Sequence, residues 1–329
     1  MTERRHALVT GAAGFIGAHL ARRLAGDGWS VRAIDVHAMP AGYTSDDIDF
    51  RLVDIRDRAA MVRALAQVDT VFNLASVHLD VKASSAEFES VNVRALEQLV
   101  ELARTAGVRR LIQVSSVGVY GHVASPPAAE DAPLAPQNDY ERTKLAGEIA
   151  ARAAAQEYGL DLVILRPAWV YGIGCPRTSK IISALRKRRF FYIGDGTNLR
   201  HPVYIDDCLD AMIAAAHVAP AGSCQTFNIA GPRWMTVEEM VQTFASVLGV
   251  PAPALHIPRW AGLAAGWSAE QVAALTGSNP PISRRTLAFF ENDNAFSTGA
   301  ARAALGFKPR IELSEGVQHT IAASANGVQ

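Results

Sequence analysis

The first 170 residues alternate short runs of aliphatic and β-branched residues with longer segments whose apolar positions recur at helical spacing. A short, continuously apolar run is typical of a strand buried on both faces of a parallel sheet. These runs predict strands at residues 6–10, 30–35, 49–53, 70–74, 110–115 and 161–166. The segments between them predict helices at residues 15–27, 58–66, 86–106 and 139–158. This alternation predicts an α/β fold with a doubly wound parallel sheet that helices cover on both faces.

Beyond Gly172 the regular alternation stops, and prolines divide the chain into shorter pieces. An apolar run at residues 225–229 predicts that the chain returns to the sheet and then leaves it again. We therefore expect a first domain over residues 1–171, with a return segment at about 200–232. Residues 172–199 and 233–329 are expected to form a smaller, interleaved C-terminal lobe.

The chain has 329 residues, which is enough for one large domain or two coupled ones. Its 32 Lys and Arg residues balance 32 Asp and Glu residues, so no long-range field attracts nucleic acid or an anionic membrane. We expect neither as a partner. The N-terminus is charged and no apolar stretch reaches about 18 residues, so we expect a cytoplasmic protein. Three widely spaced cysteines predict neither a disulfide framework nor a metal site.

The first predicted strand runs directly into a glycine-rich turn that opens the first predicted helix. The turn contains Gly11, Gly14 and Gly17, with Phe15 and Ile16 between the last two glycines. Glycines at this spacing permit a tight turn, close approach of a pyrophosphate to the backbone, and close packing of helix on strand. The helix N-terminus adds N–H donors and the positive end of its dipole. These five residues are therefore predicted to bind a dinucleotide in a Rossmann domain.

Asp35 ends the second predicted strand, about 20 residues past the glycine turn. A carboxylate there accepts hydrogen bonds from the adenosine ribose hydroxyls and repels a 2′-phosphate, which favours NAD over NADP. No arginine occupies positions 36–38 to bind such a phosphate, although Arg32 lies on the same strand. Asp54 and Ile55, directly after the third strand, are candidates to bracket the adenine; an exposed aspartate at a helix start is the alternative.

Tyr140 and Lys144 lie four residues apart on one predicted helix. This spacing places both side chains on the same helical face. A lysine ammonium beside a phenol favours the phenolate and lowers the tyrosine pKa toward the range of a general acid or base. The pair therefore predicts a site of proton transfer.

These motifs, with others along nearly the whole chain, resemble the extended short-chain dehydrogenase/reductase family, also described as NAD-dependent epimerases/dehydratases. The other matching segments are Asn73-Leu74-Ala75-Ser76, Val91-Asn92-Val93, residues 115–121, Arg166-Pro167, Val170-Tyr171-Gly172, residues 200–207 and residues 305–309. Together they are far more specific than any single motif. The resemblance implies NAD as the cofactor, residues 1–171 as its binding domain and the C-terminal lobe as the substrate-binding part.

The resemblance also implies a role for each matching residue. Tyr140 would be the general acid/base on the substrate oxygen, Ser116 would hydrogen-bond the same oxygen, and Lys144 would bind the nicotinamide ribose. Ser115 would be a buried hydroxyl at the strand end, with the reverse assignment of the two serines as the alternative. Asn92 would hold the helix that carries the ribose contacts. Further cofactor contacts are implied for Leu74, Ala75, Ser76 and Pro167.

The physical logic of such a site is coherent in itself. A secondary alcohol loses hydride to a nicotinamide only as its proton leaves, so a base and a donor to the developing oxyanion are both required. Dehydratases of the family typically add an Asp-Glu pair directly after the position of Ser116 to move protons during water elimination. This chain has Val117-Gly118 there, which disfavours a 4,6-dehydratase.

Other departures concern the substrate. Nucleotide-sugar enzymes of the family often have an asparagine at the position of Trp169, and many have a late diphosphate-binding arginine immediately before the position of Phe296. Here the late arginines, Arg284 and Arg285, lie further upstream. Arg200 does match the family's first phosphate contact. The departures therefore weaken the prediction of a diphosphate substrate, but they do not remove it. The candidate substrate contacts are His78, Ser116, Gly118, Trp169 and Arg200.

We predict an NAD-dependent enzyme that acts on a secondary alcohol carbon through a keto species, and Arg200 favours a nucleotide-sugar epimerase. The alternative is a dehydrogenase or ketoreductase on a hydrophobic alcohol or ketone, similar to 3β-hydroxysteroid dehydrogenases. A non-catalytic NAD-binding protein is disfavoured because the predicted catalytic residues are present. The hydrophobic alternative follows from the aromatic residues of the second lobe, most of which we expect in the core: Trp234, Trp260, Trp267, Phe289 and Phe290.

The resemblance finally implies a homodimer. Members of the family often pair two long helices in a four-helix interface, and the helices at residues 86–106 and 139–158 match them.

Overall fold

The computed structural model describes residues 5–78, 83–219, 224–276 and 289–325. Its centre is a seven-stranded sheet with the order β11-β6-β5-β4-β1-β2-β3, in which every neighbouring pair is parallel. The strands are β1 (His6–Thr10), β2 (Ser30–Asp35), β3 (Ile48–Leu52), β4 (Thr70–Asn73), β5 (Arg110–Val114), β6 (Asp161–Pro167) and β11 (Gln225–Ile229). The predicted α/β fold with a doubly wound parallel sheet is confirmed.

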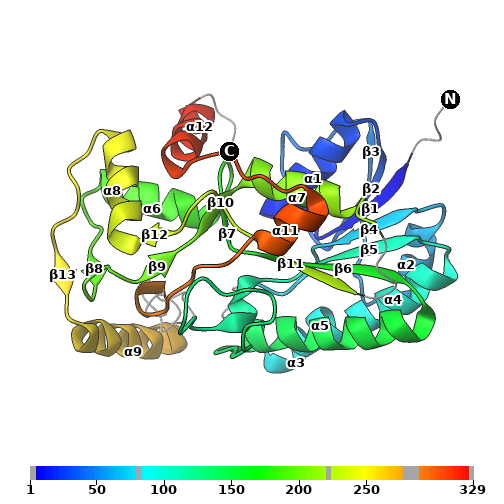
Figure 1. Cartoon of the computed structure of the whole chain (residues 1–329), viewed down its shortest axis with the longest axis horizontal. Helices are drawn as coiled ribbons and strands as arrows, with labels where there is room; N and C mark the ends of the chain where they lie inside the picture. The colour runs from blue at the N-terminus through cyan, green and yellow to red at the C-terminus, as the bar shows by residue number, and fades with distance from the viewer. Residues whose placement is uncertain (1–4, 79–82, 220–223, 277–288, 326–329) are drawn as a thin grey trace.

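Helices cover both faces of this sheet (Figure 1). One face carries α1 (Phe15–Gly26) and α7 (Ile205–Ala215); the other carries α2 (Arg58–Leu65), α4 (Ala95–Thr105) and α5 (Asp139–Tyr158). Successive strand residues point to opposite faces, so on β1 Val9 joins the core beneath α1 and α7, whereas Leu8 joins the core beneath α4 and α5. Burial on both faces explains the apolar runs within β1 and β6, whereas the edge strand β3 is largely exposed.

The predicted helix at residues 86–106 is wrong as a single α-helix. It divides into α3 (Ser85–Glu89), a π-helical turn η1 (Ser90–Arg94) and α4. Helix α5 packs closely against the π turn at Gly147. A Cβ at this position would lie only 2.4 Å from the carbonyl oxygen of Asn92, so only glycine allows the approach. The wider turn also coincides with Asn92, whose side chain bonds to a neighbouring loop.

The remaining elements form a second lobe, at the left of Figure 1. Helix α6 packs on α8, and α8 packs on α12; short strand pairs join β7 with β10, β8 with β13 and β9 with β12. The bounds are β7 (Trp169–Tyr171), α6 (Pro176–Arg186), β8 (Tyr192–Ile193), β9 (Leu199–Arg200), β10 (Pro202–Tyr204), β12 (Met235–Thr236), α8 (Val237–Leu248), β13 (His256–Ile257), α9 (Arg259–Thr276) and α12 (Leu313–Ala325).

The two parts of the chain are interleaved. Strand β11 pairs with β6, as predicted, so the chain does return to the sheet after the first segment of the lobe. The late helix α11 (Gly299–Leu305) packs against β11 and α7 rather than against the lobe helices. In the part of the chain that the structure describes, no helix is both long and apolar enough to cross a bilayer.

Candidate active site

The glycine turn after β1 is built so tightly that side chains are excluded. Gly11 has a φ of +68°, and a Cβ there would lie 2.7 Å from the backbone nitrogen of Ala75. A Cβ on Gly17 would lie 2.1 Å from the carbonyl oxygen of Gly11. Glycine meets both requirements because it has no Cβ. Gly11 thereby lies against the residues that follow β4, and the first turn of α1 lies against Gly11.

Gly14 opens this turn toward solvent. It is exposed and is the N-cap of α1, and no side chain caps the first N–H groups of the helix. The sheet order changes direction between β1 and β4, which is where doubly wound folds bind nucleotides at the carboxyl ends of their strands. These features fit a dinucleotide pyrophosphate, with Phe15 and Ile16 in the first turn of the helix.

Asp35 lies beside the glycine turn. Its carboxylate, 11% exposed, accepts hydrogen bonds from the backbone N–H of Ala13 and of His37, each at 2.9 Å. Arg32 is turned to other partners: it pairs with Asp49 at 3.1 Å and donates to the carbonyl of Ala64 at 2.7 Å. Arg32 is thus committed elsewhere, and the role of the Asp35 carboxylate against a 2′-phosphate stays a prediction.

The adenine contacts predicted after β3 stay a prediction. Asp54 pairs with Arg56, whose guanidinium lowers the pKa of the Asp54 carboxyl. Ile55 is buried in the core beneath α4 and α5, so its side chain is part of that core. The alternative helix-capping role belongs to Asp57, which accepts from the N–H of Ala60 at 3.0 Å.

Helix α5 carries the predicted Tyr-Lys pair over the end of β5. Asn138 caps the helix by accepting from the N–H of Glu141, which fixes where the first turn begins. Lys144 is buried and donates to the carbonyl oxygen of Val114 at 2.7 Å. Burial lowers the pKa of Lys144 to about 8, and the negative charge of Glu148 opposes that shift. Its ammonium is thus anchored at the end of β5, one helical turn from Tyr140.

The two serines that follow β5 have different environments. Ser115 is buried, and its hydroxyl bonds to no other described residue. Ser116 is half-buried and caps the short helix η2 (Val117–Tyr120), where its hydroxyl accepts from the N–H of Gly118 at 3.0 Å. Gly118, whose N–H is bonded to Ser116, lies against Glu141 in the first turn of α5. This geometry supports the predicted choice of Ser116.

The loop after β4 is fixed to α5 through Asn92. The amide oxygen of Asn92 accepts from the hydroxyl of Ser76 at 3.0 Å and from the N–H of Val77 at 2.9 Å. Its amide nitrogen donates to the hydroxyl of Thr143, which lies next to Lys144 on α5. At the end of this loop the ring of His78 meets that of Tyr140 edge to face, with centroids 4.5 Å apart. Asn92 thus joins three segments that carry predicted site residues.

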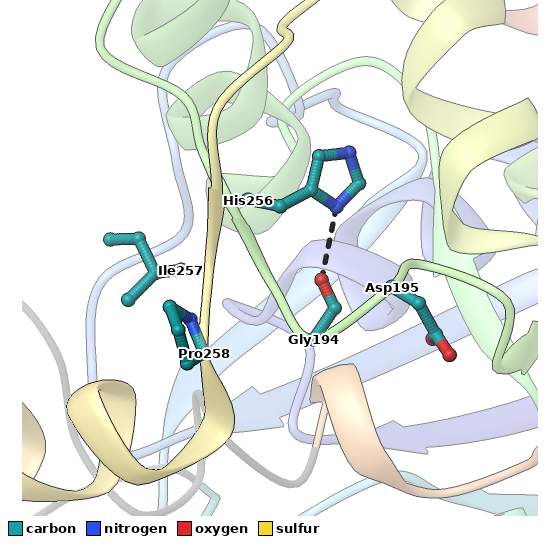
Figure 2. Close-up of a pocket in the computed structure, with 5 residues that line it drawn as sticks. All are labelled: Gly194, Asp195, His256, Ile257 and Pro258. Carbon is teal, nitrogen blue, oxygen red and sulfur yellow. Dashed lines mark hydrogen bonds between the residues drawn. The ribbon is translucent and has the colours of Figure 1, made fainter.

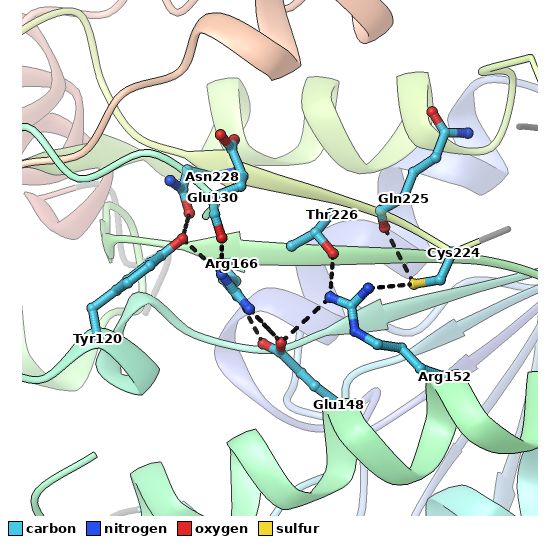
Figure 3. Close-up of polar contacts among 9 residues, drawn as sticks. All are labelled: Tyr120, Glu130, Glu148, Arg152, Arg166, Cys224, Gln225, Thr226 and Asn228. Atoms are coloured by element: carbon cyan, nitrogen blue, oxygen red, sulfur yellow. Dashed lines mark hydrogen bonds and ion pairs between the residues drawn. The ribbon is translucent and has the colours of Figure 1, made fainter. Parts of the chain in front are cut away.

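A buried ionic network, which the sequence did not reveal, holds α5 against β6 and β11 (Figure 3). Arg166 on β6 donates to both carboxylate oxygens of Glu148 on α5, with a shortest distance of 2.7 Å. The same guanidinium donates to the hydroxyl of Tyr120 at 2.7 Å, and Tyr120 donates to Asn228 on β11 at 2.8 Å. The matching segments Arg166-Pro167 and residues 115–121 contain Arg166 and Tyr120, but nothing in the sequence pointed to Glu148 as their partner.

Predicted substrate contacts lie where β7 and β9 enter the lobe. The indole of Trp169 contacts Phe244 and Phe289, and its N–H bonds to no other described residue. The Arg200 guanidinium is buried, lies 4.6 Å from the ring centroid of Phe289 and donates to the carbonyl of Asn292 at 2.8 Å. It therefore holds residues 289–292 in place, while its contact with a phosphate stays a prediction.

The aromatic residues of the lobe are less buried than predicted. Phe290 is in the core, but Trp234 is 43% and Trp260 74% exposed. Arg284, Arg285 and the side chain of Trp267 lie outside the described part of the chain.

Two pockets lie away from these residues. Figure 2 shows the first, about 420 Å³, between β8 and β13, where Nδ1 of His256 is 3.0 Å from the carbonyl oxygen of Gly194. The second, about 370 Å³, is lined by residues of α1 and α7, including His19 and Arg22. Neither is lined by a residue predicted for catalysis or cofactor binding, so the candidate active site is the region between the glycine turn and α5.

Comparison with known proteins bears on this site. A model of the NAD dependent epimerase/dehydratase family matches residues 7–230. A UDP-glucose 4-epimerase of Mycolicibacterium smegmatis is 33% identical and covers 95% of this chain and 96% of its own. A 3beta-hydroxysteroid-dehydrogenase/decarboxylase of Arabidopsis thaliana is 24% identical over 96% of this chain and 61% of its own.

Among solved structures, MoeE5 in complex with UDP-glucuronic acid and NAD aligns with a TM-score of 0.79 and 28% identity, covering 98% of this chain and 99% of its own. The resemblance seen in the sequence is thereby confirmed, and a non-catalytic role is not retained. The chain belongs to the NAD-dependent epimerase/dehydratase family and is an NAD-dependent enzyme of that family.

Proposed function

We propose that the protein is a nucleotide-sugar epimerase that inverts a secondary carbinol through a keto species. The observation that carries the proposal is the buried Lys144 of α5, one helical turn from Tyr140. Its ammonium donates to the carbonyl oxygen of Val114, the last residue of the strand that leads into Ser116. This arrangement supports a phenol as proton acceptor and a serine hydroxyl as donor to the same substrate oxygen. The likeness to a UDP-glucose 4-epimerase supports the substrate class.

When bound at the glycine turn, NAD would supply the acceptor for the hydride of the carbinol carbon and the donor that gives it back. Tyr140 takes the hydroxyl proton as the hydride leaves, so the carbon becomes a ketone and charge stays balanced. Ser116 donates a hydrogen bond to the oxygen in both states, and the Lys144 ammonium stabilises the phenolate form of Tyr140. When the ketone is presented by its other face, Tyr140 returns the proton and the epimeric alcohol forms.

Gly118 supports epimerisation over dehydration. Elimination of water needs an additional acid or base beside the reacting carbons, and the Val117-Gly118 pair offers none from its own side chains. We also propose that residues 172–199 and 233–329 supply the substrate-binding lobe, with Arg200 directed at the diphosphate when substrate is present.

A second candidate function is oxidation of a hydrophobic carbinol. The aromatic cluster of Trp169, Phe289 and the buried Phe244 favours it, as does the likeness to the Arabidopsis sterol enzyme. The buried guanidinium of Arg200, which lies against Phe289, favours the nucleotide sugar instead.

The two candidates separate in one assay. The protein is incubated with UDP-glucose and with a 3β-hydroxysteroid, each with added NAD, and sugar products and NADH absorbance are measured together. An epimerase forms UDP-galactose with no accumulation of NADH, because the hydride returns to the substrate. Stoichiometric NADH from the steroid, without sugar conversion, would refute the proposal.

A further inference from the structure

Gly118 leaves a space beside Ser116 that a side chain from another element fills. A Cβ built on Gly118 would lie 3.3 Å from the hydroxyl oxygen of Ser116. The same point is 2.9 Å from Cγ of Glu141 and 3.4 Å from its Oε1. The carboxylate of Glu141 and the hydroxyl of Ser116, which is proposed to bind the reacting oxygen, therefore flank the same point beside Gly118.

This carboxylate is held in place by the loop before α5. Its other oxygen, Oε2, accepts from the backbone N–H of Gln137 at 2.7 Å. The side chain of Gln137 in turn accepts from the amide of Asn292 at 2.8 Å. One carboxylate oxygen is thus used to fix the side chain, and Oε1 is the oxygen nearer to Gly118.

No cation neutralises this group among the ion pairs of the described residues, none of which includes Glu141. Asp139, one residue before Tyr140, makes a contrast because it pairs with Arg142. The first turn of α5 therefore presents one carboxylate paired to a cation and one directed to the site. An anionic group brought close to Glu141 would meet a like charge in a partly buried setting.

We propose that Glu141 makes the enzyme select nucleotide sugars with a neutral hydroxymethyl group at C5 over those with a carboxylate there. The inference rests on the proposed function, in which Ser116 binds the oxygen of C4. The C5 substituent of a hexose neighbours that oxygen, and so does Glu141. A hydroxyl there donates a charge-assisted hydrogen bond to Oε1, whereas a carboxylate is repelled.

The test compares UDP-glucose with UDP-glucuronic acid as substrates of the full chain. The wild type is expected to have the higher kcat/KM for UDP-glucose, and Glu141→Gln is expected to lower the ratio of the two constants by roughly tenfold or more. The amide of E141Q retains an acceptor for the N–H of Gln137. Glu141→Asp keeps the charge and is expected to keep the preference. Asp139→Asn is the matched control, because it neutralises the other carboxylate of the same turn and should leave the ratio unchanged.

Three outcomes overturn the inference. The first is a wild type with the higher kcat/KM for UDP-glucuronic acid. The second is an E141Q enzyme that converts both sugars with the ratio of their kcat/KM values within about twofold of the wild-type ratio. Both outcomes leave the epimerase function intact. A wild type that converts neither nucleotide sugar overturns the proposed function together with the inference.

Discussion

Tyr140 is the second residue of α5, and its ring contacts that of His78, in the loop after β4. Replacing it by Phe removes the proposed proton acceptor and leaves the ring packing intact. We expect Tyr140→Phe to lower kcat by about 10²–10⁴-fold with NAD binding near that of the wild type. Turnover is measured with UDP-glucose as the substrate, and NAD binding is measured by calorimetry. Tyr158→Phe, at the far end of the same helix, is the control, and equal activity of the two variants would contradict the role of Tyr140.

Lys144 carries a stability cost that depends on pH. Burial lowers its pKa to about 8, whereas an unfolded lysine titrates near 10.5. Below pH 8 the ammonium is charged in both states, so the folded protein bears the full cost of burying it. Between these two pKa values the folded state loses its proton first, and the free energy of unfolding rises with pH.

Lys144→Met removes this buried charge. We expect it to abolish turnover and yet raise the free energy of unfolding at pH 7 by about 1–3 kcal/mol, after the lost bond to Val114 is subtracted. The gain should shrink toward pH 10, where the wild-type lysine is largely neutral. Urea unfolding at both pH values checks this expectation; a less stable variant at pH 7 would show that the hydrogen bond outweighs the burial cost.

We expect Asp35 to decide the choice between NAD and NADP. Since Arg32 is engaged by Asp49, removing the carboxylate should relax discrimination against a 2′-phosphate without creating a strong site for it. We expect Asp35→Ala to lower the ratio of the NADP dissociation constant to the NAD dissociation constant by about one to two orders of magnitude. Calorimetric titration of cofactor-depleted protein measures both constants. His37→Ala, which removes the exposed neighbour of Asp35, serves as the control; a wild type that already prefers NADP would refute this reading.

At the scale of elements, one buried ion pair joins α5 to β6. The side chains of Arg166 and Glu148 are 3% and 2% exposed, so loss of either partner strands a charge away from water. We expect Arg166→Met to lower the free energy of unfolding by about 3–5 kcal/mol. Arg152→Met removes a half-exposed arginine 3.8 Å from the same carboxylate and should cost about 1 kcal/mol or less. Chemical denaturation compares them, and equal losses would show that burial of the pair is not the cause.

The elements that could be predicted from the sequence are those whose signal is local. Strand β1, strand β2 and helix α5 have the predicted bounds because apolar runs, an Asn138 cap and a terminal Gly159 mark them. The π turn at Asn92 could not be predicted, since it depends on the close approach of Gly147 from a helix far along the chain. Local periodicity does not contain that contact.

The candidate site divides in the same way. The glycine turn and the Tyr140–Lys144 pair are fixed by spacing within one segment, so they were predictable. The Glu141 carboxylate lies beside Gly118 because glycine leaves space for it there. The partner of Glu148 is Arg166, which lies on another element, β6. Contacts between elements decide both, and one sequence without its fold does not show them.

At the scale of the whole molecule, α5 presents an apolar side chain to solvent. Ile149 is 61% exposed on the helix that packs with α4, the pair proposed to form a four-helix dimer interface. We expect the wild type to be a dimer and Ile149→Arg to be a monomer at micromolar concentration. In the variant, dimerisation would remove the arginine from water at the centre of the interface. Light scattering after size exclusion measures the mass. Leu255→Arg, equally exposed on the other lobe, should stay dimeric; a monomeric wild type would contradict the interface.

The pairing of β11 with β6 also constrains how the protein is made. Strand β6 is buried from Leu162 to Pro167, and the edge that faces away from β5 pairs with β11, which begins at Gln225. A nascent chain that has left the ribosome only as far as Tyr171 therefore exposes an apolar sheet edge until the missing neighbour is synthesised. Fragments cut at this point should aggregate, and chaperones that shield unpaired edges should bind the growing polypeptide during that interval.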